Sequence, residues 1–265
     1  MPTNMLPNTD GVDFAALYNE HPEYVARRNT NSFEQVQTEL VVRLFKLPCL
    51  MSVLPAGLKL QRALEIGCAT GELIAAVSVE SGGERVGVDI APANIAAAMD
   101  RFPNVRFLGG DFRVANLSGF DVVIISDVLE HVPDDVAFLR DAARLGNIVL
   151  VNLPLEDNLL NNCRAYGPND TSGHLRRYSL DQGLALFDRA GLEVLKHTQI
   201  WFHETQAELA YRALRRERQG SAYSGARPIA LAKHCIFAAA TVIRPIGRKL
   251  FSSNLFAAAR LRSVQ

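Results

Sequence analysis

The sequence predicts an α/β fold built on a doubly wound, mostly parallel sheet. Between residues 60 and 200, short segments rich in Val, Ile and Leu alternate with segments of helical periodicity. The short segments are apolar on both sides, as strands are when helices cover both faces of a parallel sheet. This repeated strand-and-helix order is typical of the architecture.

Each element has its own local signal. Strands are predicted at residues 62–67, 85–90, 104–111, 120–127, 147–154 and 192–200. Helices are predicted between them at residues 71–80, 92–102, 133–145 and 179–191. Pro92 suits the first turn of its helix, Ser179 is a suitable N-cap, and Gly191 a C-terminal stop.

The flanking regions follow a different pattern. Residues 10–50 have amphipathic helical spacing, and Pro48 and Pro55 are expected to end that region. Beyond residue 200, a helix is predicted at 204–218 and a Gly/Ser-rich turn at 219–228. The remaining predictions are a helix at 229–250 with a kink at Pro245 and a short strand at 253–261.

The composition excludes some classes of function. The chain has 265 residues, 48% of them hydrophobic, and its 28 basic and 28 acidic residues give no net charge. Proteins that hold nucleic acid by its phosphates usually carry a basic excess, so no nucleic acid partner is expected. The four cysteines form no C-x-x-C pair, and no signal peptide is visible. We therefore expect a cytoplasmic protein.

The segment "ALEIGCATGELIAAV" contains the most informative turn. Its Gly67 and Gly71 follow a strand and open a helix, so that backbone N–H groups can approach a ligand. Asp89 ends the next strand, where an acid can bind the two hydroxyls of a ribose. Asp111 and Phe112 end the third strand and offer a purine an acceptor and an apolar wall. Together these residues favour a nucleoside site over a tight turn without a ligand.

Four segments, "LEIGCATG", "VGVDIAP", "LGGDF" and "FDVVIISDVLEHVPD", occur in an order and spacing that resemble class I S-adenosylmethionine-dependent methyltransferases. The resemblance covers about residues 60–200. It implies a Rossmann-like, seven-stranded sheet with an antiparallel last strand. The expected domains are then an N-terminal helical cap at 1–55, the core at 56–200, a helical insertion or lid at 201–251, and the final core strand at 252–265.

The resemblance also implies roles for individual residues. Glu65 would hold the methionine amine, Asp89 the ribose, and Asp111 with Phe112 the adenine. The full expected set of cofactor-binding residues is Glu65, Gly67, Cys68, Ala69, Gly71, Asp89, Ile90, Asp111, Phe112 and Ser126. Ala69 stands where the family commonly has a glycine. A nicotinamide dehydrogenase is disfavoured, because Glu65 would repel a pyrophosphate but suits a cationic sulfonium ligand.

"SDVLEHVPDD" and "GHLRRYS" supply the expected catalytic residues Asp127, His131 and His174. If the first segment is helical, Asp127, Glu130 and His131 share one face. Three interpretations stay open: ordered loop residues, a histidine general base, or a divalent-metal set of Asp127, Glu130, His131 and His174. The E-x-x-E-H pattern resembles quinone-biosynthesis O-methyltransferases and small-RNA 2′-O-methyltransferases, although Asp127 replaces the first Glu. No metal is assigned.

The resemblance implies a methyltransferase that uses S-adenosylmethionine. We expect O-methylation of a small molecule or of a carbohydrate- or lipid-linked intermediate. The alternatives are a catalytically silent cofactor-binding module and an RNA methyltransferase. The apolar and basic residues of 229–250 are expected to pack on the domain or a second subunit, or to touch a membrane surface. The N-terminal segment is expected either to cap the sheet or to cover the cofactor cleft.

Overall fold

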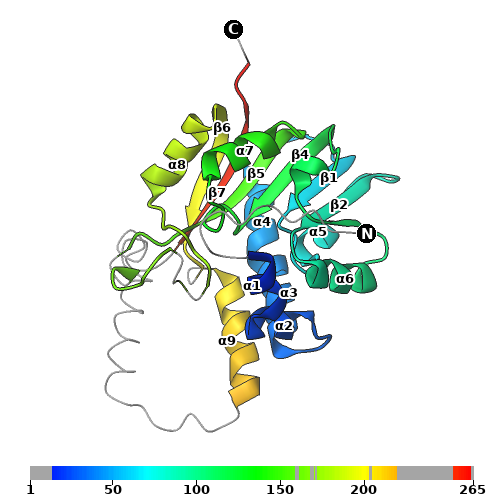
Figure 1. Ribbon diagram of the computed structural model, residues 1–265, viewed down its shortest axis with the longest axis vertical. Helices are drawn as coiled ribbons and strands as arrows, with labels where there is room; N and C mark the ends of the chain where they lie inside the picture. Colours follow the sequence, from blue (N-terminus) through cyan, green and yellow to red (C-terminus); the bar gives the residue numbers. More distant parts are fainter. Residues whose placement is uncertain are drawn as a thin grey trace.

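The computed structural model describes residues 14–158, 161–167, 170, 172–202, 205–219 and 253–263. Its centre is a seven-stranded sheet with the order β3-β2-β1-β4-β5-β7-β6 (Figure 1). The strands are β1 (Arg62–Ile66), β2 (Glu84–Asp89), β3 (Arg106–Gly109), β4 (Phe120–Ser126), β5 (Gly146–Leu155), β6 (Leu192–Ile200) and β7 (Ser253–Leu261).

The sheet has the predicted fold class. Strands β1 to β5 pair in parallel, whereas β7 lies between β5 and β6 and is antiparallel to both. The last strand of the chain is therefore the antiparallel one, as expected. The carboxyl ends of β1, β2, β4 and β5 meet at one edge, where ligands bind in such sheets.

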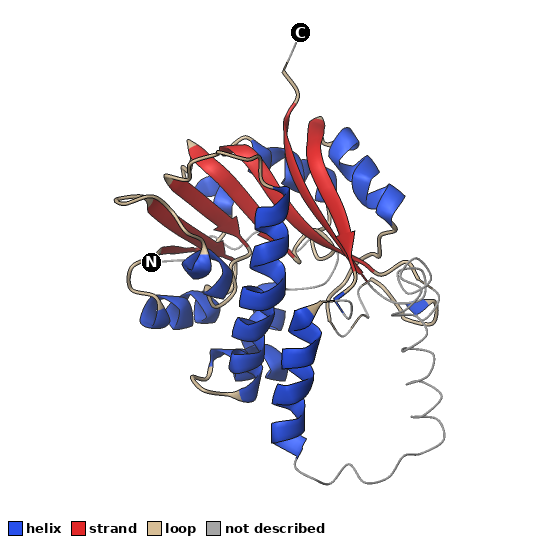
Figure 2. Ribbon diagram, turned by 180° about the vertical axis from the view of Figure 1, so that it is seen from behind, coloured by secondary structure: helices blue, strands red, loops and turns tan. Residues whose placement is uncertain are grey.

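Helices cover both faces of the sheet (Figure 2). One face packs against α4 (Leu47–Val53), α5 (Glu72–Ala76) and α6 (Pro92–Arg101). The other packs against α7 (Asp135–Ala143) and α8 (Leu180–Arg189). Ile124 of β4 belongs to the first apolar layer and Val123 to the second, both without exposed surface. Burial on both faces explains why the strands are apolar throughout.

Local signals at the helix ends act as predicted, with one difference in length. Ser179 forms a capping box with Gln182 at the start of α8, and Gly191 follows its end with φ 78°. Helix α5, predicted to reach residue 80, ends at Ala76. The chain after it is extended because its backbone pairs elsewhere: Glu80 donates to the carbonyl of Leu60.

The expectation that Pro48 ends the N-terminal helical region is wrong. Helix α3 (Phe33–Val41) continues through a π-helical segment, η1 (Val42–Lys46), directly into α4. Pro48 has no N–H to donate, and it lies in the first turn of α4, directly after the wider π turn. The helix ends at Val53, and Leu54 is extended as residues before a proline tend to be.

Two further helices, α1 (Phe14–Glu20) and α2 (Pro22–Arg28), lie with α3 beyond the carboxyl edge of the sheet (Figure 1). Helix α9 (Gln206–Gln219) packs beside α3. A short 3-10 turn, η2 (Phe112–Val114), follows β3. The predicted helix at 229–250 and nearly all of the predicted turn before it lie outside the described residues. Among the helices that are described, none has the length and apolar character needed to cross a membrane.

Candidate active site

The turn between β1 and α5 requires its glycines. Gly67 and Gly71 have φ values of 76° and 86°, in the left-handed region that side chains rarely adopt. A Cβ at Gly67 would lie 2.4 Å from Cγ2 of Val128, and one at Gly71 would lie 2.7 Å from the Phe107 ring. Ala69 is also left-handed, with φ 45°. The chain thus keeps the geometry of a glycine turn although a methyl group occupies its middle.

Asp89 holds this turn from the end of β2. Its Oδ2 accepts a hydrogen bond from the N–H of Ala69 at 2.8 Å, and its Oδ1 accepts one from Ala91 at 2.9 Å. The residue is 8% exposed, and burial raises the pKa of its carboxyl. Asn94 Nδ2 also donates to Oδ1 at 3.4 Å. A carboxylate has about four acceptor positions, so these three bonds leave room for a further hydroxyl donor.

Glu65 is buried at the end of β1, with 3% of its surface exposed. Its Oε2 accepts a hydrogen bond from the N–H of Ile74, in the first turn of α5, at 2.9 Å. Burial raises the pKa of Glu65 to about 8, although the positive charge of Lys46 opposes the shift. Glu65 therefore caps a helix with one oxygen, and a cationic ligand would favour its ionised form.

The other residues expected to bind the cofactor, after β2, after β3 and at position 68, differ in how exposed their side chains are. Oδ1 of Asp111 accepts from the N–H of Arg113 at 3.0 Å. The Phe112 ring is buried edge-on against Phe138, with ring centroids 5.0 Å apart, so it faces the core. Cys68 is also buried, and its N–H donates to Val88. Ile90, by contrast, keeps 36% of its surface exposed. Of these apolar residues, Ile90 thus presents an exposed side chain at the end of β2, whereas Phe112 packs in the core.

Asp127, at the end of β4, forms an ion pair that the sequence did not predict. Lys46 Nζ lies 2.7 Å from Asp127 Oδ2. Ser126 Oγ and Asn152 Nδ2 donate to the same oxygen at 2.9 and 3.0 Å. Burial alone would raise the pKa of Asp127, but the charge of Lys46 and these hydrogen bonds lower it. These contacts favour the ionised carboxylate of Asp127 and fix it through Oδ2.

The segment after Asp127 is a series of turns and not a helix. Asp127 has φ 55°, so it does not share a helical face with Glu130 and His131 as the spacing suggested. The structure brings together Glu130, His131 and His174 instead, with possible ligand atoms all within 4.8 Å of one another. Of the four residues in the expected metal set, Asp127 is the one outside this cluster.

The two histidines have defined roles for their ring nitrogens. Nδ1 of His131 lies 3.0 Å from the carbonyl of Gly173, which can only accept, so this nitrogen carries the proton. Burial lowers the pKa of His131 to about 4, which keeps the ring neutral. Nδ1 of His174 donates to Oε2 of Glu156 at 2.6 Å. In the neutral form of each ring Nε2 is then the acceptor, and the ring centroids lie 4.7 Å apart with the rings edge-on.

Glu156, the partner of His174, is held by a series of ion pairs. Glu156, which directly follows β5, also accepts from Arg164 Nη1 at 2.8 Å. Arg164 in turn makes two bonds to Asp170, at 2.7 and 2.8 Å. Glu156 was missed in the sequence, although it is an acid at a strand end like those that were found. Lys46 was also missed, and it carries no comparable signal.

Glu130 is the least satisfied group in the cluster. It is 1% exposed, and among the described residues neither of its side-chain oxygens has a hydrogen-bond partner. Burial, followed by the charge of Asp127, raises the pKa of Glu130 well above its ordinary value. Burial therefore favours the neutral acid form of Glu130, and a cation bound beside it would favour the carboxylate.

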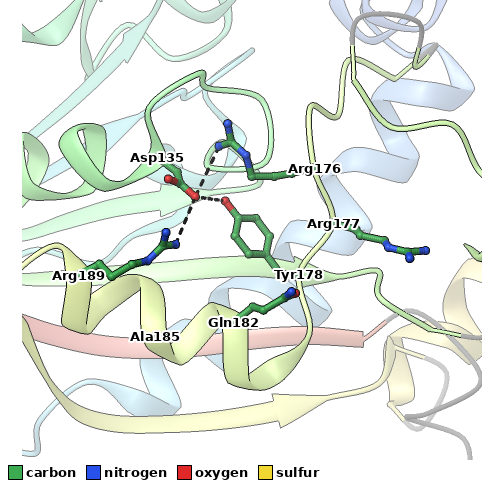
Figure 3. Close-up of a pocket in the computed structure, with 7 residues that line it drawn as sticks. All are labelled: Asp135, Arg176, Arg177, Tyr178, Gln182, Ala185 and Arg189. Carbon is green, nitrogen blue, oxygen red and sulfur yellow. Dashed lines mark hydrogen bonds and ion pairs between the residues drawn. The ribbon is translucent and has the colours of Figure 1, made fainter.

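Arg176 and Tyr178 hold the turn that carries Glu130 and His131. Arg176 donates to the carbonyls of Val132 and Pro133 at 2.7 and 2.6 Å, and the Tyr178 hydroxyl donates to Asp135 at 2.7 Å. Figure 3 shows Arg176, Tyr178 and Arg189 converging on Asp135 in a pocket of about 370 Å³. Arg177 points away from Asp135. These contacts hold the turn of Glu130 and His131 in place from its far side.

The N-terminal helices lie over the same edge. Asn19 Oδ1 accepts from the N–H of Ala93 at 3.3 Å, and Arg28 donates to Asn94 at 3.1 Å. The Tyr18 ring lies 5.9 Å from the ring of His131. Helix α1 therefore spans the edge from the start of α6 to the histidine pair.

Residues 63–147 match the family model of a methyltransferase domain. Together with the sheet order and the glycine turn, this match identifies a methyltransferase domain within the chain. The fold is the Rossmann-like one of class I S-adenosylmethionine-dependent methyltransferases.

One curated protein resembles part of the sequence, and solved structures share the fold. The ubiquinone biosynthesis O-methyltransferase of Azorhizobium caulinodans is 38% identical over 96 residues, which span 34% of this chain and only 38% of that protein. Phosphoethanolamine N-methyltransferase 2 of Haemonchus contortus, solved with S-adenosylmethionine, has a TM-score of 0.63 at 18% identity, covering 95% of this chain and 61% of that one. Magnesium protoporphyrin IX methyltransferase from Synechocystis has a TM-score of 0.53 at 13% identity, covering 96% and 100%.

The cofactor of this class is S-adenosylmethionine, and the residues present fit it. Two buried carboxyls, Glu65 and Asp89, end adjacent strands beside a turn in which added Cβ atoms at Gly67 and Gly71 would clash. The burial that raises the pKa of Glu65 makes a cationic group a favourable neighbour. An ammonium suits Glu65, and ribose hydroxyls suit Asp89.

Proposed function

We propose that this protein transfers a methyl group from S-adenosylmethionine to a hydroxyl oxygen of a small molecule, with His174 as general base. The observation that carries the proposal is the 2.6 Å hydrogen bond from His174 Nδ1 to Glu156. It orients the ring and leaves Nε2 as a proton acceptor beside the end of β4. A hydroxyl acceptor needs such a base, whereas a neutral amine does not.

When bound, S-adenosylmethionine supplies a methyl group on a positively charged sulfur. Glu65 binds the ammonium and Asp89 the ribose hydroxyls. The turn from Gly67 to Gly71 and Ser126 line the middle of the cofactor, and Ile90 and Asp111 lie at its adenine. Helix α1, with Tyr18, covers the cleft and excludes water. Orientation of this kind is worth on the order of several kcal/mol.

His174 performs the proton transfer. Its Nε2 would take the proton of the acceptor hydroxyl as that oxygen receives the methyl group. Glu156, fixed by Arg164, stabilises the imidazolium that forms. His131 stays neutral and offers its Nε2 as a hydrogen-bond acceptor that positions the substrate. Asp127 supports the site through Lys46 and Asn152 and takes no proton itself.

Two observations support oxygen as the methylated atom. The curated relative with 38% identity over 96 residues is an O-methyltransferase. The pair of His174 and Glu156 can also deprotonate a hydroxyl, which O-methylation requires. Structural likeness alone does not decide the reaction, because a [4+2]-cyclase shares the fold with a TM-score of 0.53.

A second candidate is a site that also holds a divalent cation. Glu130, His131 and His174 offer one carboxylate and two imidazole donors within 4.8 Å, and both Nδ1 protons are held by outer partners. The two unpartnered oxygens of Glu130 favour this candidate. The cation would supply a positive charge for the acceptor oxygen. Asp127 would not be a ligand, because Lys46 already pairs with it.

The proposed function is tested by incubating the protein with S-adenosylmethionine labelled in its methyl group and small hydroxyl compounds, with and without a chelator. Label should appear in an ether that is stable to base. Tight cofactor binding with no turnover on any acceptor would instead favour a silent binding module. Label in RNA would favour the RNA methyltransferase. Loss of turnover with the chelator would favour the cation site.

A further inference from the structure

The methionine part of S-adenosylmethionine carries a carboxylate as well as an ammonium. The residues assigned so far account for the ammonium, the ribose and the adenine, but not for this carboxylate. We propose that Lys46 binds it. The inference rests on the proposed cofactor and adds a specific residue to its site.

Lys46 lies where such a partner is needed. It is the last residue of η1, and its Nζ reaches Asp127 Oδ2 at the end of β4. Its positive charge also opposes the burial that raises the pKa of Glu65 and of Glu130. The ammonium of Lys46 therefore lies among carboxyls from β1, from β4 and from the turn after β4. Glu65, the residue assigned to the methionine ammonium, is one of them.

Lys46 has binding capacity left after its contact with Asp127. A lysine ammonium has three N–H donors, and one is directed at Asp127 Oδ2. That oxygen also accepts from Ser126 and Asn152, so Asp127 has neutral partners of its own. The Lys46 side chain keeps 27% of its surface exposed. An incoming carboxylate can thus reach the ammonium without breaking the ion pair.

Other cations near the cleft are already engaged. Arg28 donates to the carbonyls of Tyr18 and Asn19 and to Asn94, on the side of the ribose. Arg101 pairs with Glu72 at 2.6 Å. Within the described part of the chain, Lys46 is the cation that acts on Glu65. Glu65 and Lys46 together thus offer one negative and one positive group, which match the ammonium and the carboxylate of the methionine part.

The π turn gives a reason for this placement. A π turn inserts an extra residue and rotates the side chains that follow around the helix, and such turns are frequent at functional sites. Here Leu47 donates to the carbonyl of Val42, and Lys46 is the last residue inside the turn. A regular helix would direct this side chain differently.

The test compares two ligands that differ only in the carboxylate. Calorimetry measures the binding of S-adenosylmethionine and of decarboxylated S-adenosylmethionine, which keeps the ammonium, the sulfonium and the nucleoside. The wild type should bind S-adenosylmethionine at least tenfold more tightly. Lys46→Gln should bind both within about twofold. Lys59→Gln is the matched control, since Lys59 is 80% exposed, and it should keep the preference.

Each outcome is decisive. A wild-type preference below twofold overturns the inference without any variant, which covers the case in which Lys46→Gln does not fold. A preference that survives in folded Lys46→Gln also overturns it. An equal loss of affinity for both ligands assigns Lys46 a merely structural role. If the wild type binds neither ligand, the proposed function itself fails.

Discussion

The carboxylate of Asp89 accepts a hydrogen bond from the backbone N–H of Ala69 at 2.8 Å. This contact joins the end of β2 to the middle of the glycine turn. It also fixes Ala69 in a left-handed conformation with φ 45°. Asp89 therefore stabilises the turn and is also the predicted ribose ligand. A substitution in the turn should affect cofactor binding, and a substitution of Asp89 should affect the turn.

Ala69→Gly should stabilise the protein. A residue with a Cβ loses roughly 1–2 kcal/mol in the left-handed region, and glycine does not. Part of this gain is offset by the greater freedom of glycine in the unfolded chain, which leaves up to about 1 kcal/mol. Thermal unfolding should show a midpoint raised by a degree or more. Ala75→Gly, in α5, should instead lower it, and a lower midpoint in Ala69→Gly would contradict the account.

Glu65 should release a proton when S-adenosylmethionine binds. Its folded-state pKa of about 8 lies above the ordinary 4.5, so the free protein keeps at pH 6 a proton that the unfolded chain has lost. Its stability contribution therefore falls as the pH rises from about 4.5 through 8. The cofactor ammonium favours the ionised form, so binding at pH 6 should release close to one proton.

Calorimetry in buffers of different ionisation enthalpy measures this release. Glu65→Gln is the control and should lose most of it. An observed binding enthalpy that does not depend on the buffer would show that Glu65 is not the partner of the ammonium.

His174→Ala should lower turnover far more than cofactor affinity. Loss of a general base lowers kcat by roughly 10²–10⁴-fold, whereas the dissociation constant of S-adenosylhomocysteine should change less than about threefold. Glu156→Gln should give an intermediate loss and shift the pH profile of kcat. His197→Ala, at an exposed position on β6, is the control. Equal loss of kcat and affinity in His174→Ala would argue against a base.

Tyr178→Phe should destabilise the catalytic turn. The Tyr178 hydroxyl donates to the partly buried carboxylate of Asp135, and Tyr178 itself is 3% exposed, so the substitution removes one donor from that carboxylate. The expected loss is roughly 1–3 kcal/mol of unfolding free energy, measured by chemical denaturation. Tyr211→Phe removes a longer, partly exposed bond to Gln37 and should lose less. Equal stability of Tyr178→Phe and wild type would refute the bracing role.

Much of the fold was predictable because its signals are local. Apolar strands, the caps Ser179 and Gly191, and acids at strand ends can each be recognised within a few residues. The glycine turn was predictable for the same reason, and even Ala69 keeps its geometry. Pro48 misled the prediction because its missing hydrogen bond is tolerated after a π turn.

The site was less predictable because its pairings are distant in sequence. Lys46 meets Asp127 from a helix 81 residues earlier, and no motif marks that lysine. His174 meets Glu156 from 18 residues later in the chain, and Arg164 bonds both Glu156 and Asp170. The spacing of Asp127, Glu130 and His131 suggested one helical face, but the left-handed Asp127 separates the first from the others.

The central claim is that the carboxylates at the ends of β1 and β2 bind S-adenosylmethionine. Titration calorimetry with S-adenosylhomocysteine tests it most directly. The account predicts binding at one site per chain, and an affinity at least tenfold weaker in Asp89→Ala, since a hydrogen bond to a charged group is worth about 1.5–3 kcal/mol. No binding to the wild type, or an unchanged affinity in Asp89→Ala, would contradict it.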